Sequence, residues 1–516
     1  MIRSHPAEFL ALVVLVGATR IGAQGIATQS PSSGPVPVQI KSQNTPAVRK
    51  PCALPGISAH RLRDVVDATY MLQPPLAADA MIRIAAKVAS PCPTLAKDLL
   101  QRAFDQAESV EPATAYKRAL RIGTLTDSRT NYMANAFSLQ MDRLSLQSRA
   151  VLGMVPLDAG KAIQLFQRMT PPHPPAVSCA NAFVSDVSIY YDALRKITPL
   201  LKAQKSRNDT EALVFLQLQE VAGATISPVQ LPPLAKILED ADLSTTDLSS
   251  LLSTVASAVE NFPVDNNSFY SDGDYPAVKA KVQLLQLASK KGVSSNALTH
   301  AFHDYLDRSL NGPHCVGNGP KDLKQLVILY ESFNRSSAAL DQGIEALNIP
   351  TSAPPLEPHP EEGEFWVTPQ TEELLVDAKH LNFDDRWGRY TDANRKTPEW
   401  QDRVRHLLND LDDWRPTDES EPADYYHQRC MLLYEILEYL PPSPLYDRVV
   451  ATWMNTFAES SLQWDKPAEW YFEVSRFLRF SRKDSKQQIP TAALAPLKNS
   501  SSPYLHALGV LAEFLQ

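Results

Sequence analysis

The segment from Thr299 to Cys315, THAFHDYLDRSLNGPHC, repeats histidine and aspartate at helical spacing. Imidazole and carboxylate groups are common ligands of first-row metal ions, and positions three, four and seven apart lie on one side of a helix. The segment therefore offers a candidate metal site. Its possible ligands are His300, His303, Asp304, Asp307 and His314.

The apolar residues of the same segment give a simpler interpretation. They fall on the opposite side of the expected helix, so the histidines and aspartates would form an ordinary solvated face. The residues of this apolar side are Leu298, Ala301, Phe302 and Tyr305, with Ser309 among them. We favour the solvated face over the metal site formed by His300, His303 and Asp307, and the sequence predicts no cofactor.

Two further pairs, Asp377 with His380 and Asp424 with His427, have the carboxylate-x-x-His spacing of di-metal sites in helical bundles. With 58 acidic residues and 11 histidines in 516 positions, 58 × 11/516 gives about 1.2 such pairs by chance. Chance therefore explains the two observed. Nucleophile-elbow, phosphate-loop and H-E-x-x-H motifs are absent from the sequence, so no catalytic residue is assigned.

The tryptophans suggest a different chemistry. All seven follow Phe365, and two of them stand beside aspartates in the segments DDRWGRY and LDDWRP. Exposed indole rings stack on sugars, and a pair of carboxylates can hydrolyse a glycosidic bond. The residues of this alternative, a carbohydrate-active enzyme or sugar-binding protein, are Asp385, Trp387, Asp412 and Trp414.

The N-terminus has the three parts of a secretory signal. Arg3 precedes the apolar run Phe9–Ala18, and small residues follow. The run is shorter than the ~20 residues of a membrane-spanning helix, so we expect export after cleavage of residues 1–23, although a retained signal anchor is an alternative. Residues 24–50, rich in proline and serine, are expected to form a flexible linker.

Export would allow disulfides among the five cysteines. Four of them lie in proline-containing loops at the borders of expected helices, whereas Cys430 lies in the apolar run YYHQRCMLLYEIL. We predict the pairs Cys52–Cys92 and Cys179–Cys315, and we expect Cys430 to be a free buried thiol.

The fold is predicted to be all-α. The clearest helix is STTDLSSLLSTVASAVENF, in which Ser244 can cap the first amides and Asp247 can interact with the helix dipole. Its apolar residues recur at spacings of three and four, and they are Leu248, Leu251, Leu252, Val255, Val259 and Phe262. Only 18 glycines and few β-branched runs leave little material for hairpins.

Three segments, PPLAADAMIRIAAKV, PTLAKDLLQRAFDQA and PLDAGKAIQLFQRM, each begin with proline and continue with alternating small and large apolar residues. This pattern, over about residues 57–170, resembles helices of tetratricopeptide-type repeat proteins, without their 34-residue period. The resemblance implies an array of stacked helical hairpins whose concave face binds a peptide or partner protein.

A proline-rich acidic segment at 348–364 is predicted to link two domains, a repeat-like domain at 51–347 and a tryptophan-rich helical domain at 365–516. A net charge of −8 without basic runs argues against a nucleic-acid partner. The sequence therefore predicts an exported helical scaffold that binds a protein or peptide partner and has no stable membrane insertion.

Overall fold

The computed structural model describes residues 58–110, 115–118, 139–174, 183–204, 207–263, 276–311, 369–381, 394–415, 422–460, 477 and 489–515. All of these belong to one compact unit, Pro51–Gln516. The predicted signal, the flexible linker and the segment 348–364 lie outside the described residues. The division into two domains at 348–364 therefore stays a prediction.

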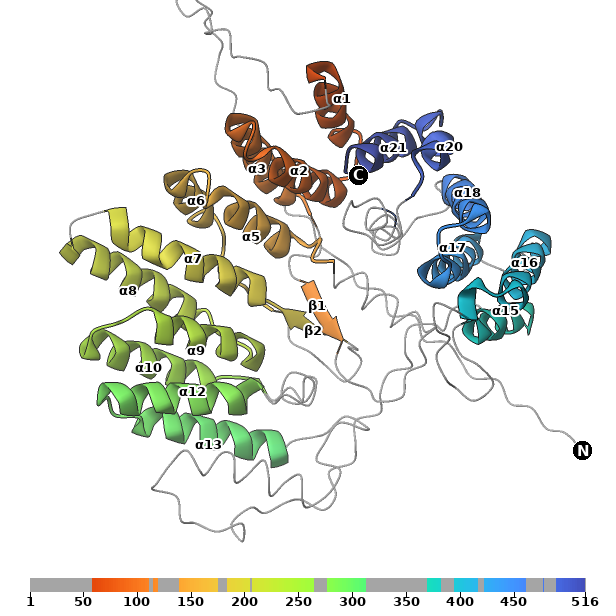
Figure 1. The fold of residues 1–516 in the computed structure, drawn as a ribbon. Coiled ribbons are helices and arrows are strands. Elements are labelled where there is room, and N and C mark those ends of the chain that lie inside the picture. The colour runs from red at the N-terminus through yellow and green to blue at the C-terminus, as the bar shows by residue number, and fades with distance from the viewer. Residues whose placement is uncertain are drawn as a thin grey trace, which may run out of the picture. The chain divides into compact units, whose positions relative to one another are not determined.

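Helices make up almost all of the described structure, which confirms the predicted all-α class (Figure 1). In the N-terminal part they are α1 (Ala59–Thr69), α2 (Pro74–Val88), α3 (Pro93–Ala107), α5 (Arg143–Met154), α6 (Ala159–Phe166), α7 (Ser188–Gln204), α8 (Arg207–Gly223), α9 (Leu231–Asp240), α10 (Thr245–Glu260), α12 (Pro276–Lys291) and α13 (Asn296–Asn311). In the C-terminal part they are α15 (Pro369–His380), α16 (Pro398–Asp413), α17 (Pro422–Tyr439), α18 (Pro444–Ser460), α20 (Ala495–Lys498) and α21 (Pro503–Leu515). Short 3-10 turns occupy Pro228–Gln230, Asn394–Lys396 and Thr491–Leu494.

The described strands are β1 (Ala115–Arg118) and β2 (Phe183–Asp186). They pair antiparallel, with Ala115 opposite Asp186 and Arg118 opposite Phe183. The sequence did not predict this pairing, because each strand is only four residues long and neither has a marked alternation of apolar and polar residues.

From α2 to α13, each helix packs against helices close to it along the chain, in several cases the next but one. Helix α3 contacts α2 and α5, α7 contacts α5 and α8, and α10 contacts α8 and α13 (Figure 1). In the C-terminal part α17 packs on α18, and the last helix, α21, contacts α1 and α2. Arg61 of α1 pairs with Glu513 of α21 at 3.0 Å, so the two ends of the described chain are joined directly.

Helix α10 has the cap and the apolar face that its sequence predicts. Ser244 precedes the helix, and its hydroxyl accepts a hydrogen bond from the Asp247 amide at 3.1 Å and donates one to the Asp247 carboxylate at 2.7 Å. Every apolar residue predicted for this face is buried: Leu248, Leu251, Leu252, Val255, Val259 and Phe262. Local sequence signals were therefore sufficient to place this helix and its buried side.

The helix expected in PLDAGKAIQLFQRM is present as α6, and its proline lies before the helix. Pro156 lies in the turn between α5 and α6 and not in the first turn of α6. The helix begins later because the carboxylate of Asp158 accepts a hydrogen bond from the Lys161 amide at 3.0 Å. A side chain that caps an amide is a stronger start signal than a proline that only tolerates the first turn.

Candidate functional site

The predicted metal ligands whose side chains are described lie on the outer side of α13, in agreement with the solvated-face interpretation. His300 and Asp304 are exposed and His303 is half-buried, whereas the side chain of Asp307 and all of His314 lie outside those described. The opposite side is buried, as predicted, through Leu298, Ala301, Phe302, Tyr305 and Ser309.

Within the described ranges, no three histidine, cysteine, aspartate or glutamate side chains are placed to hold a metal ion together. Asp377 and His380 are both exposed on α15. The side chains of Asp424 and His427, on α17, are not among those described. The described side chains thus bring no candidate metal ligands together.

The proposed sugar platform is buried where the structure describes it. The side chain of Trp414 is only 1% exposed, and its ring packs edge-on against Tyr425 with a centroid distance of 4.9 Å. A stacking platform needs an exposed ring face, which Trp414 does not present. Trp387 and Asp385 lie outside the described residues.

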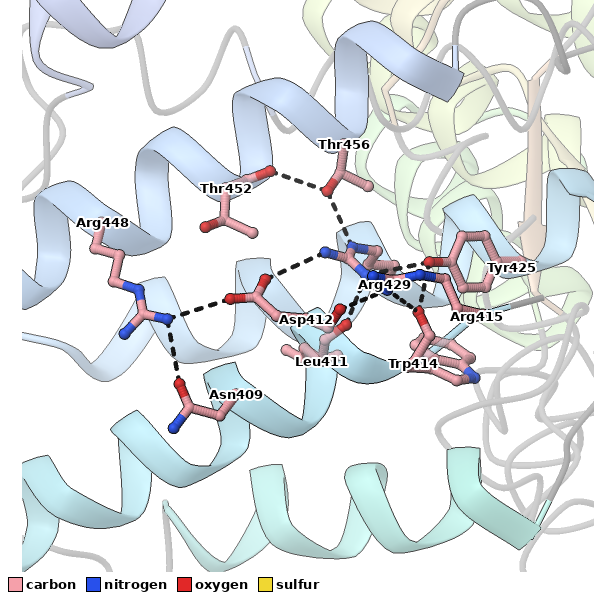
Figure 2. Close-up of polar contacts among 10 residues, drawn as sticks. All are labelled: Asn409, Leu411, Asp412, Trp414, Arg415, Tyr425, Arg429, Arg448, Thr452 and Thr456. Carbon is pink, nitrogen blue, oxygen red and sulfur yellow. Dashed lines mark hydrogen bonds and ion pairs between the residues drawn. The ribbon is translucent and has the colours of Figure 1, made fainter.

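Asp412 belongs to a network centred on Arg429 of α17 (Figure 2). The Arg429 guanidinium donates to the Leu411 carbonyl at 2.6 Å, and it lies 3.5 Å from the Asp412 carboxylate. It also donates to the hydroxyls of Tyr425 and Thr456, at 3.1 and 3.2 Å. Arg429 therefore joins α16, α17 and α18.

The same network satisfies the end of α16. Tyr425 donates its hydroxyl proton to the Trp414 carbonyl at 2.9 Å, and Arg429 binds the carbonyl of Leu411 (Figure 2). These carbonyls have no partner within the helix, and they carry the negative end of its dipole.

Arg308 of α13 binds the end of α10 in the same way, through the carbonyls of Phe262 and Glu260 at 2.9 and 2.8 Å. Both arginines are thus structural groups that cap neighbouring helices.

Replacing Arg429 with lysine should lower the free energy of unfolding by about 1 to 3 kcal/mol. A single ammonium group cannot make all the hydrogen bonds by which the guanidinium group joins three helices. Urea denaturation followed by tryptophan fluorescence measures the change. The matched control is Arg448→Lys, since Arg448 also contacts Asp412, at 3.2 Å, but is 46% exposed and should change stability by less than about 1 kcal/mol. Equal effects of the two substitutions would contradict the structural role of Arg429.

A second charged cluster is buried between α2 and α5. The Asp79 carboxylate, 1% exposed, accepts from the Arg83 guanidinium at 2.7 Å and from the Arg149 guanidinium at 2.5 Å. Burial acts to raise the pKa of Asp79, but the two guanidinium groups outweigh it and lower the pKa to about 2. Both carboxylate oxygens are engaged in these ion pairs, and the group titrates far below neutral pH. The cluster therefore connects two helices and has no free acid or base for catalysis.

A third group, Asp142, begins α5. One of its carboxylate oxygens accepts from the Ser145 amide at 2.9 Å, while the other is buried without a hydrogen-bond partner. Burial raises the pKa of Asp142 to about 6, and the charge of Asp186 adds to this increase. Asp186 accepts from the amide and hydroxyl of Ser188 at the start of α7. Two aspartates that cap helices thus repel each other electrostatically.

The sequence did not single out Asp79, Asp142 or Arg429. One signal for Asp79 was available, because an acidic residue within the apolar segment PPLAADAMIRIAAKV, four positions before Arg83, must find a partner if that helix is buried. Arg429 gave no such signal, since Leu411, Asp412 and Thr456, which it contacts, lie on other helices.

The cysteine prediction is partly tested. Cys430 is fully buried and is not part of a disulfide, as predicted. Cys92, which precedes α3, is disulfide-bonded. Because Cys52, Cys179 and Cys315 lie outside the described residues, the pairs Cys52–Cys92 and Cys179–Cys315 stay predictions.

No protein-family model matches the chain, and comparison with curated proteins and with solved structures gave no match. None of the described helices combines the length and hydropathy needed to cross a bilayer.

Proposed function

We propose that this protein is an exported helical scaffold that binds a protein or peptide partner. The clusters around Asp79 and Arg429 use their polar atoms to join helices, which suits a scaffold better than a catalytic centre. The packing of α2 to α13 on helices one or two places away in the sequence supports an array of the repeat type, in which long outer faces remain available to a partner.

The observation that carries this proposal is an exposed pair of large side chains after α1. Tyr70 is 50% exposed and Met71 is 57% exposed. Arg102 of α3 lies over the Tyr70 ring, 5.9 Å from its centroid, and hydrogen-bonds to its hydroxyl. Tyrosine, methionine and arginine are enriched at the centres of protein interfaces. Together they form a surface suited to an apolar side chain of a partner.

Export is part of the proposal and rests on the sequence. Arg3, the apolar run Phe9–Ala18 and the small residues after it have the order of a secretory signal. The disulfide at Cys92 supports an oxidising compartment, where such bonds persist.

Site-specific photo-cross-linking in the native host tests the proposed partner surface. A benzophenone amino acid at Met71 of the full-length chain should give discrete cross-linked species that disappear when Tyr70 is replaced by serine, because the partner would lose its main contact. The same photo-cross-linker at Val376, which is 48% exposed on α15, is the control. Absence of adducts at Met71, or the same adducts at both positions, would contradict this surface.

A further inference from the structure

A second surface lies on the outer sides of α8 and α10. Leu216 is 60% exposed, Ala212 is exposed and Leu213 is half-buried, although the other side of α8 is buried through Val214 and Leu218. Helix α8 is thus apolar on two sides, and within the described residues α7 and α10 are its main helix neighbours. The outward side therefore presents apolar side chains to solvent.

The neighbouring side of α10 continues this surface without charge. Its outward residues are Ser249, Ser250, Ser253, Thr254 and Ser257. The Gln219 amide of α8 donates to the Thr254 hydroxyl at 2.6 Å, so the two outward sides adjoin. Among the described side chains, formal charges occur at Glu220, one turn beyond Leu216, and near the ends of α10 at Asp247 and Glu260.

We infer that this α8–α10 surface is where two copies of the chain associate. A chain with a net charge of −8 repels its own copies, so the contact that costs least is one whose centre carries no charge. Apolar side chains there gain from burial, and hydroxyl groups can hydrogen-bond across a close contact. A symmetric dimer places the same surface on both sides, so an uncharged face is compatible with itself.

The size of the surface fits a dimer contact. Helices of 17 and 16 residues are roughly 25 Å long, and two packed helices are roughly 20 Å wide. Each copy would bury roughly 500 Å², or roughly 1,000 Å² in total, which is the size at which specific interfaces begin. The inference is independent of the partner surface at Tyr70 and Met71, because it uses different helices.

Sedimentation velocity of the full-length protein tests the inference over about 1 to 100 μM, the range in which so small an interface should dissociate. The wild-type protein should change from monomer to dimer as its concentration rises. Leu216→Glu and Ser253→Glu should each raise the dissociation constant more than about tenfold, because both place like charges at the centre of the contact. Val376→Glu, at an exposed apolar position on α15, should leave the dissociation constant unchanged.

The outcomes separate clearly, provided that circular dichroism shows each variant to be folded. A wild type that stays a single chain at the highest concentration would overturn the inference. Dimers that persist in both the Leu216→Glu and the Ser253→Glu variants would also overturn it. An equal weakening of the dimer by Val376→Glu would overturn it as well. Cross-linking at Met71 is measured separately, so the partner-binding proposal can fail while the dimer stands.

Discussion

Replacing Asp79 with asparagine should lower the free energy of unfolding by about 3 to 5 kcal/mol, because two largely buried guanidinium groups lose their counter-charge while the amide keeps the same shape. Arg83 and Arg149 are only 26% and 19% exposed, so water does not replace the missing carboxylate fully. Urea denaturation at neutral pH measures the loss. We expect it to be the largest effect of any single charge-neutralising substitution proposed for this protein.

The control for Asp79 is Asp98→Asn on α3. Asp98 also pairs with an arginine four positions away, Arg102, at 2.9 Å, but both side chains are about half exposed. An exposed pair of this kind contributes less than about 1 kcal/mol. A loss at Asp79 as small as that at Asp98 would show that the buried cluster does not stabilise the fold.

The pH dependence of the Asp79 contribution follows from its depressed pKa. The pKa of Asp79 is about 2 in the folded chain, against the value of 3.8 taken for the unfolded chain. The stabilisation is therefore present above about pH 4 and is lost as the pH falls through about 2. The stability difference between wild type and Asp79→Asn should therefore be constant from neutral pH to about pH 4 and should shrink below it.

Replacing Asp142 with asparagine should have the opposite effect and should raise the free energy of unfolding at neutral pH. The folded chain raises the pKa of Asp142 from 3.8 to about 6, so its favourable contribution is complete below about pH 4 and is lost as the pH rises through about 6. Asparagine keeps the helix cap but has no charge to bury. We expect a gain of about 1 to 3 kcal/mol near pH 7.5 and almost none near pH 4.

Asp158→Asn is the matched control for Asp142, since Asp158 also caps its helix through the amide three positions later. Its side chain is 38% exposed, and its pKa is lowered by the hydrogen bond from the Lys161 amide and by Lys97. This substitution should give no gain in stability at neutral pH. Equal stabilisation by both substitutions would mean that burial of Asp142 is not the cause.

The sequence by itself determined the helices and their buried sides. In α10 the Ser244 cap and the three-and-four spacing of leucine and valine are local signals, acting within one or two turns, and the structure has both. On α13 the same spacing separated exposed His300 and Asp304 from buried Phe302 and Tyr305. In α6 the Asp158 cap, and not Pro156, marks the start of the helix at Ala159.

Only the tertiary structure decided which polar groups meet. Asp79 and Arg149 are 70 positions apart, and Trp414 has a buried ring beside Tyr425 although its neighbour Asp412 is half exposed. Periodicity shows which side of a helix is buried, but it does not show which helix covers that side or whether a buried charge finds a partner there. Those outcomes depend on contacts between segments distant in the sequence. For this reason the sequence predicted the fold class, while the buried clusters at Asp79, Asp142 and Arg429 became visible only in the packed structure.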